Sequence, residues 1–246
     1  MIAIKRLVEE PYASVICYPR VSNSELKKRL TELERLGIEA LEFNGPKQVL
    51  DVHVLGKGCV GIVALAYRER AKVALKIRRI DANRSRMQQE AEMLRKANLE
   101  RVGPQLLGVS EDFLLMQFID GELLPEWLER QRSSLKVRKV LRDVLAQCWR
   151  LDMAALDHGE LSHAPKHVIV DVKNRPFIVD FETASISRKP SNLTSICQFL
   201  FMSGIAEKVS EKIGEKDKKM IREALRGYKR FRSADNFRKV LETCGL

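Results

Sequence analysis

A glycine-rich turn that runs directly into a β-strand constrains the fold of this chain more than any other feature. Gly56, Gly58 and Gly61 have the spacing G-x-G-x-x-G, in which glycines permit a tight turn and let backbone N–H groups approach phosphate oxygens. In a dinucleotide-binding fold the last glycine opens a helix, whereas residues 62–67 alternate like a strand. No Gly-Lys-Ser/Thr follows, which argues against a P-loop. The turn therefore predicts a phosphate-handling loop between two strands.

The residues around this turn have the alternation of an antiparallel sheet. Apolar side chains recur at every second position over residues 49–77, apart from the turns. This pattern predicts three consecutive strands, joined by the glycine turn at 56–61 and a charged turn at 68–70. A helix follows, and two further strands are predicted at residues 105–109 and 113–119.

The second half of the chain is mostly helical. Apolar residues at helical spacing predict helices at 123–131, at 135–156 and from residue 192 to the end. Two short β-branched runs, at 168–170 and 177–179, interrupt the helices and predict a hairpin.

Residues 1–47 have the pattern of a small α/β extension. Ser22 begins a helix with capping-box spacing, and Gly37 ends it. The predicted fold class is therefore α+β and bilobal, with a β-rich N-lobe at residues 48–119 and an α-helical C-lobe at residues 120–246. A cleft between two lobes is a preferred place for a ligand.

The composition narrows the class of protein. The chain has 246 residues and a formal net charge of +11, and no apolar run approaches the ~18 residues of a membrane span. Its start lacks the pattern of a secretory signal, and its five cysteines are single, with no CxxC pair. A disulfide framework and a zinc ribbon are therefore not expected. These features predict a cytoplasmic protein with no membrane partner.

Most of the positive excess lies near the C-terminus. Between Lys216 and Lys239 three acids oppose ten basic residues: Lys216, Lys218, Lys219, Arg222, Arg226, Lys229, Arg230, Arg232, Arg238 and Lys239. We expect this segment to add a weak affinity for nucleic acid. The alternative, a solvated helix face, is the commoner reason for such a run, and apolar residues at helical spacing indicate that the segment also packs.

Lys76 lies within an apolar strand, in the sequence Val-Ala-Leu-Lys-Ile at 73–77. A buried ammonium group is costly without a partner, so a carboxylate on the following helix is expected beside it. Glu90 and Glu92 are both available, and Glu90 is preferred because it lies next to the apolar face of that helix. Close to the glycine turn, Lys76 is predicted to bind phosphate as a compact charge. The alternative is a lysine on an edge strand that points to water.

The ordered motifs GKGCVGIV, VALKI, EAEML, LLMQFIDG, HGEL and VDFE, spread over residues 49–185, resemble the protein-kinase fold. The form HGEL, in place of HRD, is similar to atypical and small kinases: the RIO and Bud32 types, lipopolysaccharide kinases and aminoglycoside phosphotransferases. The length and the N-terminal extension resemble predicted serine/threonine kinases of archaea. This resemblance implies ATP as the nucleotide and Mg²⁺, or alternatively Mn²⁺, as the metal ion.

The resemblance also implies a set of nucleotide-binding residues. In that family the segment after the fifth strand binds adenine through its backbone, and Met116 stands at the gatekeeper position before Gln117 and Phe118. The complete implied set is Gly56, Lys57, Gly58, Gly61, Val63, Ala74, Lys76, Glu90, Met116, Gln117 and Phe118. A plain core strand explains the side chains at 116–118 equally well.

Three residues take catalytic positions in this resemblance. Glu160 of HGEL is the carboxylate that orients the acceptor hydroxyl, Lys76 binds phosphate, and Asp180 of VDFE binds the metal ion. The chain departs from the family because Pro165 stands where an asparagine would bind a second ion. His167 precedes the next strand, as that asparagine usually does, and is a further candidate metal ligand, although magnesium prefers oxygen.

The segment after Asp180 is too short for a regulatory activation loop. Residues 183–190 alone separate the VDFE motif from the next helix, and Gly159 stands where regulated kinases have an arginine. The sequence thus predicts an ATP-dependent phosphotransferase of the atypical serine/threonine kinase class, acting on an unidentified protein or small-molecule hydroxyl. The alternative is a nucleotide-binding pseudokinase or scaffold, associated with RNA through its basic C-terminal segment.

Overall fold

The structure is a computed structural model that describes residues 1–83 and 85–246. It is a mixed α+β protein that divides into two compact units. The first unit comprises Met1–Arg95 and Pro104–Phe118, and the second comprises Lys96–Gly103 and Ile119–Leu246. Among the described helices, none combines the length and the apolar character needed to cross a membrane.

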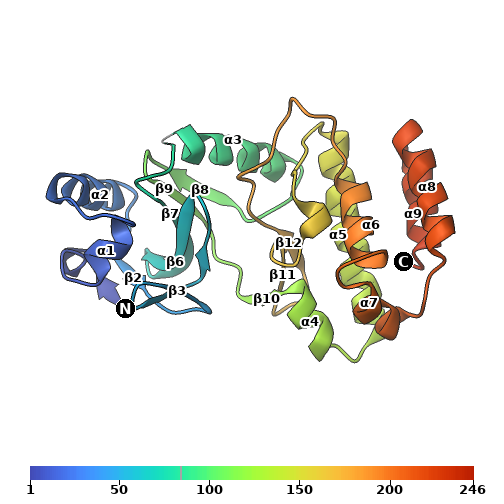
Figure 1. Cartoon of the computed structure of the whole chain (residues 1–246), viewed down its shortest axis with the longest axis horizontal. Coiled ribbons are helices and arrows are strands. Elements are labelled where there is room, and N and C mark those ends of the chain that lie inside the picture. Colours follow the sequence, from blue (N-terminus) through green and yellow to red (C-terminus); the bar gives the residue numbers. More distant parts are fainter. Residues whose placement is uncertain (84) are drawn as a thin grey trace. The chain divides into compact units, whose positions relative to one another are not determined.

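The first unit is built on an antiparallel sheet with the strand order β1-β2-β6-β7-β9-β8, with β5 paired to β6 (Figure 1). Its elements are β1 (Ile2–Ala3), a 3₁₀ turn (Ile4–Arg6), α1 (Tyr12–Ile16), α2 (Asn23–Arg35), β2 (Ala40–Glu42), β3 (Lys47–Val49), β4 (Val52–Val54), β5 (Gly56–Lys57), β6 (Gly61–Arg68), β7 (Ala71–Arg78), most of α3 (Ser85–Leu99), β8 (Leu106–Val109) and β9 (Phe113–Gln117).

Helix α2 begins and ends as its sequence predicts. The Ser22 hydroxyl accepts a hydrogen bond from the Glu25 N–H at 3.3 Å, which satisfies one of the free amides of the first turn. Gly37 follows the helix with φ at +73°, a conformation that a glycine adopts without strain.

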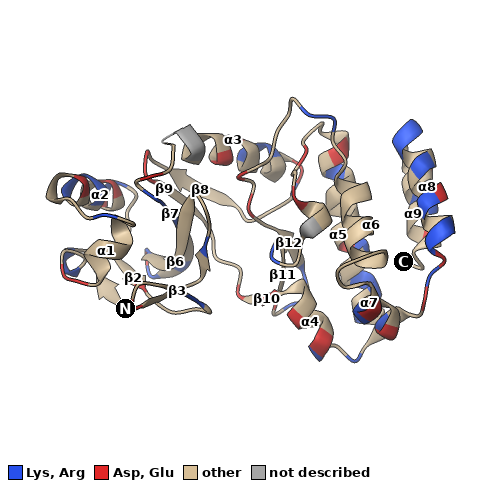
Figure 2. Cartoon of the chain, viewed as in Figure 1, with Lys and Arg blue, Asp and Glu red and all other residues tan. Residues whose placement is uncertain are grey.

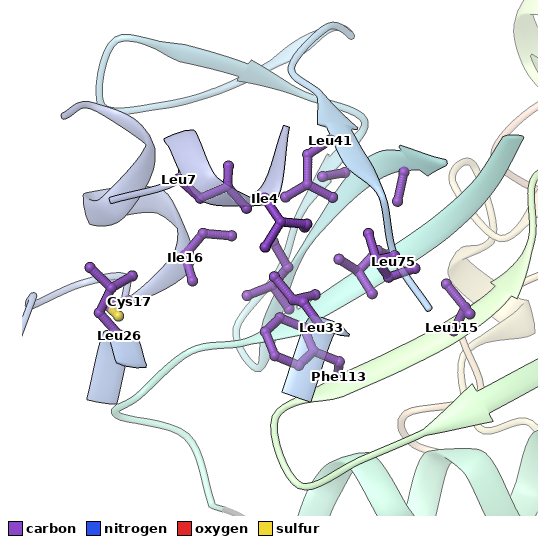
Figure 3. Close-up of a cluster of buried hydrophobic side chains, with 14 of the residues drawn as sticks. Ile4, Leu7, Ile16, Cys17, Leu26, Leu33, Leu41, Leu75, Phe113 and Leu115 are labelled. Atoms are coloured by element: carbon purple, nitrogen blue, oxygen red, sulfur yellow. The ribbon is translucent and has the colours of Figure 1, made fainter. Parts of the chain in front are cut away.

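Residues 1–47 are part of the first unit rather than a separate extension. They supply strands β1 and β2 of the main sheet, and β2 pairs with β6. They also supply helices α1 and α2, whose apolar side chains pack on one face of the sheet against Leu75, Phe113 and Leu115 (Figure 3). The sequence pattern predicted strands by their alternation, but it did not predict that residues 1–47 would pack on one face of the sheet.

The opposite face of the sheet carries α3. Leu114 alternates with Phe113 and Leu115, and it joins a buried cluster with Met87 and Ala91 of α3. Lys76 lies opposite Leu114 in the β7–β9 pairing, so the two side chains share this face. Both faces of the sheet are thus packed, and the face that α3 covers also carries Lys76.

The first of the three strands predicted over residues 49–77 is broken in two. Residues 52–54 form β4, which pairs with β3 in a separate two-stranded sheet, and only β5 continues along β6. Val49, Val52 and Val54 pack in one buried cluster with Val15 of α1 and Ile62 of β6. The strands β6, β7, β8 and β9 confirm the remaining predictions.

A buried network of charges joins α2 to the sheet within the first unit. Arg29 is fully buried and donates to the Ile16 carbonyl at 2.6 Å, to the Arg78 carbonyl at 2.7 Å and to Asp112 Oδ1 at 3.0 Å. Arg78 donates from Nε to the same Asp112 oxygen at 2.8 Å, and Lys28 lies 3.0 Å from the other one. Burial raises the pKa of Asp112, but Arg29, Lys28 and Arg78 outweigh it and hold that pKa below its usual range.

The second unit is mostly helical and contains one small antiparallel sheet, β10-β11-β12. Its elements are β10 (Gly121–Leu123), α4 (Leu124–Arg130), α5 (Ser134–Met153), a 3₁₀ turn (Leu161–His163), β11 (Val168–Asp171), β12 (Pro176–Ile178), α6 (Asn192–Phe201), α7 (Ala206–Ile213), α8 (Lys218–Arg230) and α9 (Ala234–Thr243). The predicted hairpin is therefore confirmed, and β10 adds a third strand to it.

The C-terminal helices pack by one face and expose the other. Ile221, Leu225 and Tyr228 on α8 are buried. The cationic residues of α8 are exposed, and they give this helix its blue face in Figure 2. The basic segment is thus part of the folded unit, as its apolar spacing predicts.

Candidate active site

The predicted site residues fall into two groups, one in each unit. The first group surrounds the hairpin between β5 and β6, where the Gly58 N–H donates to the Gly61 carbonyl at 2.8 Å and closes the turn. Gly61 has no space for a side chain: a Cβ there would lie 2.9 Å from the Ile77 carbonyl oxygen and 3.1 Å from Lys76 Cγ. The last glycine of the motif therefore lets the Lys76 side chain pass directly over the backbone.

Lys76 and Glu90 form a buried ion pair. The Nζ atom of Lys76 lies 2.7 Å from Glu90 Oε2, and the two residues are only 5% and 3% exposed. The sequence predicted this pairing, with Glu90 preferred over Glu92. Removing two charges from water is costly, and replacing such a pair by apolar residues is often neutral or stabilising. The pair lies directly beside Gly61 of the glycine turn, so a candidate anion-binding group and a Cβ-free backbone are neighbours.

The other candidates of the first unit lie around this pair. In the strand pairing Val63 is opposite Lys76, and Ala74 is opposite Met116. Met116 packs at the edge of the α3 cluster, which also takes in Val60 of the glycine turn.

The remaining candidates of the first unit, at Lys57, Gln117 and Phe118, make different kinds of contact. Lys57 lies over the ring of Tyr18, with Nζ 5.3 Å from its centroid, a cation–π contact that the motif does not predict. The Gln117 N–H donates to the Gln105 carbonyl at 2.8 Å, while Phe118 is half-buried. The main-chain donor of Gln117 is therefore already used inside the unit.

The second group surrounds the loop that carries Glu160. Gly159 has φ at +94°, and a Cβ there would lie 2.7 Å from Arg188 Nη2 and 2.9 Å from Thr183 Oγ1. Arg188 reaches this place from the segment after Asp180, and it donates from Nε to Asp157 Oδ2 at 3.0 Å. A larger residue at position 159 would displace the arginine.

Glu160, His167 and Asp180 converge within the second unit. His167 Nε2 lies 3.1 Å from Glu160 Oε2 and 3.8 Å from Asp180 Oδ2. His167 is 1% exposed, whereas the two carboxylate side chains are 40% and 36% exposed. The 3.1 Å contact has the distance of an ion pair without the angle of a hydrogen bond. Burial lowers the pKa of His167, although Asp180 and Glu160 oppose that shift.

His158 braces this loop as a neutral ring. It is fully buried, and burial together with the neighbouring His167 lowers its pKa to about 4. Its Nε2 lies 3.1 Å from the Val179 carbonyl oxygen, which can only accept, so Nε2 carries the proton. Phe181 packs edge-on against the ring with centroids 5.1 Å apart.

Asp180 has an unfavourable backbone conformation. Its φ of +68° lies in the left-handed region, which residues with a Cβ rarely adopt. Such strain persists only where the surroundings fix the backbone, and it is concentrated at functional sites. Here Phe181, which is 1% exposed, and the Val179–His158 hydrogen bond fix the residues on either side.

The segment after Asp180 is held closely to the loop before it. The Asp157 N–H donates to the Ser185 carbonyl at 2.9 Å, and the Ser185 N–H donates back at 2.8 Å. Asp157 also accepts from the Ser191 N–H at 3.1 Å and from Arg188. The short segment expected from sequence is thus an anchored one.

A second buried network supports the loop from the C-terminal helices. Asp152, on α5, accepts from the Asn192 N–H at 2.9 Å and from the Tyr228 hydroxyl at 3.0 Å. The Asn192 side chain accepts from the His158 N–H at 2.8 Å. Burial raises the pKa of Asp152. Sequence reasoning missed Asp152, Asn192 and Arg188, because no local motif marks a residue that acts through contacts more than 30 positions away.

The two groups offer different sets of polar side chains. The chain matches no protein-family model and no curated protein. The first unit offers a Cβ-free turn beside a buried lysine, which suits an anionic ligand, and the second offers two accessible carboxylates with a buried imidazole, which suits a cation or a hydroxyl group.

Proposed function

We propose that this protein is an ATP-dependent phosphotransferase of the atypical serine/threonine kinase class, with a bilobal kinase-like fold. The buried Lys76–Glu90 pair beside the Cβ-free Gly61 carries this proposal. An ammonium group held in one place by a carboxylate is ready to bind phosphate without further ordering. The motif resemblance of the chain agrees with this assignment.

The donor sets fit ATP with a divalent ion. A side chain at Gly61 would meet Lys76, so glycine at this position keeps the backbone of the turn close to the ammonium group, and both would contact phosphate oxygens. Asp180 offers a partly exposed carboxylate, the ligand that Mg²⁺ prefers. When bound, the metal–nucleotide complex supplies an activated phosphoryl group.

The residues of the chain then take distinct roles. Lys76 binds phosphate oxygens and neutralises their charge, and Glu90 keeps its ammonium group in position. Glu160, 40% exposed, orients the hydroxyl of the acceptor and accepts its proton. His158 and Arg188 position the Glu160 loop through Val179 and Asp157.

The acceptor is a folded protein, the chain itself or a small molecule, rather than an extended peptide. The segment at 183–190 is pinned to Asp157 through Ser185 and Arg188, so it is not available as a peptide platform. Its anchoring also supports a kinase without a phosphorylation-dependent switch in this segment.

The test is the thermal stability of the chain with and without ATP and Mg²⁺ or Mn²⁺. At a ligand concentration of about 100 times Kd the native state gains ~2.7 kcal/mol, a rise of several degrees in Tm. Lys76→Ala should remove the rise. Lys72→Ala is the matched control, because Lys72 lies exposed on the same strand. A wild-type protein whose Tm does not move at millimolar nucleotide contradicts the proposal.

A second candidate is a nucleotide-binding scaffold that associates with RNA. The exposed basic face of α8 favours it, since six cations on α8 are exposed: Lys218, Lys219, Arg222, Arg226, Lys229 and Arg230. Nucleotide binding without phosphate transfer, combined with salt-sensitive RNA binding, would favour the scaffold over the phosphotransferase.

A further inference from the structure

We propose that the exposed side of α8 is a binding site for single-stranded RNA, in which a band of cations binds the phosphates and Phe231 stacks on a base. The cationic band consists of six residues: Lys218, Lys219, Arg222, Arg226, Lys229 and Arg230. The inference goes beyond the proposed phosphotransferase, because it uses none of the candidate active-site residues and holds whether or not the chain transfers phosphate. It also goes beyond exposed charge alone, because it assigns an aromatic contact that distinguishes a single strand from a duplex.

The cationic band is continuous along one side of the helix, which Figure 2 shows in blue. Its members form two adjacent rows, one through Lys218, Arg222 and Lys229 and the other through Lys219, Arg226 and Arg230. The band extends for about 18 Å along the helix axis, since each residue adds about 1.5 Å. A stacked strand places one phosphate every ~3.4 Å, so the band matches roughly five phosphates.

The charges of the band are not used inside the protein. Within residues 1–83 and 85–246 none of the six side chains makes an ion pair or a hydrogen bond, whereas Lys208 pairs with Glu129 on the surface of the same unit. Like charges three or four residues apart repel, and cations in the first turn oppose the helix dipole, so the band weakens its own helix. A merely solvated face mixes both signs, but Glu223 is the one acid of α8. A polyanionic ligand therefore explains the band better than solubility does.

An exposed aromatic ring and an open stretch of backbone lie next to the band. Phe231, directly after Arg230, is 70% exposed, and in the described part of the chain no other aromatic residue is exposed. Gly227 lies one turn earlier, and its carbonyl accepts a hydrogen bond from the Phe231 N–H at 3.0 Å. A Cβ at Gly227 would meet nothing within 4 Å, so packing does not explain a glycine here, although glycine weakens a helix interior. The glycine instead lets a ligand approach the helix backbone beside the ring.

This combination favours a single strand over other polyanions. Bases of a single strand stack on aromatic side chains, whereas a duplex keeps its base faces inside the stack. A membrane surface would have to take up the apolar face of α8, but Ile221, Leu225 and Tyr228 on that face are buried within the unit. An acidic protein segment would use the cations and leave Phe231 without a role. Single-stranded stretches are common in RNA and transient in DNA, so RNA is the expected partner.

The experiment measures the binding of a fluorescently labelled oligouridylate of about 12 nucleotides to the full chain by anisotropy, at low salt and without ATP. Phe231→Leu keeps the net charge, so general electrostatic attraction is unaffected, but it removes the ring and should weaken binding at least about fivefold. Leu135→Ala is the control, because Leu135 is 80% exposed on another helix of the same unit and its replacement should leave the affinity unchanged.

Gly227→Gln tests the open backbone without damage to the fold. Glutamine is a better helix former than glycine, and free space surrounds this position, so the Tm should stay equal or rise. The affinity for oligouridylate should nevertheless fall severalfold, because the new side chain occupies the place where the strand approaches. A loss of binding in a protein of undiminished Tm cannot come from unfolding.

An RNA duplex, polyglutamate and the matching deoxyuridylate strand separate the possible partners. Phe231→Leu should leave the affinities for the duplex and for polyglutamate unchanged. Wild-type affinity for oligouridylate in both Phe231→Leu and Gly227→Gln overturns the site. Tighter binding of polyglutamate or of the DNA strand than of RNA overturns the choice of partner. The ATP-dependent rise in Tm tests the phosphotransferase separately, so either proposal can fail while the other stands.

Discussion

Two clusters of charged and polar residues, one in each unit, are built from similar groups and arranged in opposite ways. Around Asp112, the buried Arg29 and Arg78 make hydrogen bonds to carboxylate and main-chain oxygens. Around His167, a buried imidazole lies 3.1 Å from Glu160 and 3.8 Å from Asp180, and both carboxylate side chains are partly open to solvent. The first arrangement stabilises a fold, and the second leaves capacity for a ligand.

The difference separates structural from functional charge in this chain. Asp112 carries a pKa below its usual range because three cations outweigh its burial. His158 and His167 carry lowered pKa values because burial dominates. We therefore expect substitutions in the cluster around Asp112 to lower the stability of the fold, and substitutions in the cluster around His167 to lower the proposed activity.

Replacing Asp112 by asparagine should give the largest loss of stability. The change removes the fully buried carboxylate that Arg29 and Arg78 share and leaves them Glu25, 2.8 Å from Arg29 Nε, as a counter-charge. Breaking a buried ion pair costs about 3–5 kcal/mol. Chemical denaturation measures the loss. Asp51→Asn serves as the control, since Asp51 is exposed in the same unit and should change stability by less than about 0.5 kcal/mol. Equal effects of the two substitutions would break the distinction.

Acid should act on the second unit before the first. An unfolded histidine takes up a proton near pH 6.5, whereas burial lowers the pKa of His158 in the folded protein to about 4. Between these values the unfolded state binds more protons than the folded state, so the stability decreases as the pH falls from 6.5 to 4. Asp112 has a folded pKa below its unfolded value, so its contribution is lost only below about pH 3.8.

Tryptophan fluorescence can follow this order, because Trp127 and Trp149 both lie in the second unit. The denaturant concentration at the midpoint of the fluorescence transition should decrease as the pH is lowered from 6.5 to 4. Amide hydrogen exchange in β6 and β7 should stay slow over the same range. A fluorescence midpoint that is constant over this range would contradict the expectation.

Asp180 tests whether strain accompanies function in the second cluster. Asp180→Ala and Asp180→Gly both remove the carboxylate and should abolish nucleotide-dependent phosphate transfer. Glycine accepts a φ of +68° without strain, so Asp180→Gly should be more stable than Asp180→Ala by about 1 kcal/mol. If denaturation finds the alanine variant equally stable, the left-handed backbone at this position carries no strain.

The exposed charge of α8 should have the smallest effect, visible only at low salt. Salt dependence is measured as the slope of the logarithm of the RNA-binding constant against the logarithm of the salt concentration. Replacing four cations by glutamine, at Lys218, Lys219, Arg226 and Arg230, should reduce the size of this slope for single-stranded RNA by roughly 3 and leave the fold intact. The charge-matched control replaces four exposed lysines of the first unit: Lys5, Lys27, Lys47 and Lys72. Identical slopes for the two variants would mean that α8 has no special affinity.

Local patterns predicted the parts of the molecule that depend on local spacing. The glycine turn, the strand that follows it and the Lys76–Glu90 pair were all expected, because 14 positions and one strand-to-helix connection separate the pair. The cap at Ser22 was likewise expected, since it links residues three apart.

The remaining features depend on contacts between distant segments. Arg29 and Asp112 are 83 positions apart, and nothing in either neighbourhood marks a buried charge. Arg188 occupies the space that a side chain at position 159 would need. From the sequence, Gly159 was noted only because regulated kinases have an arginine at this position. The role of residues 1–47 was missed for the same reason, because coverage of a sheet face is decided by tertiary packing.

The most direct test of the central claim is transfer of labelled phosphate from γ-³²P-ATP, with Mg²⁺ or Mn²⁺, to the chain itself and to proteins of a cell extract. Glu160→Gln keeps the shape of the side chain and removes the carboxylate that orients the acceptor. We predict transfer by the wild type and a loss of about 10²-fold or more in Glu160→Gln, with the nucleotide-dependent rise in Tm retained. Transfer at the wild-type rate by Glu160→Gln, or no transfer by a wild type that binds ATP, would contradict the account.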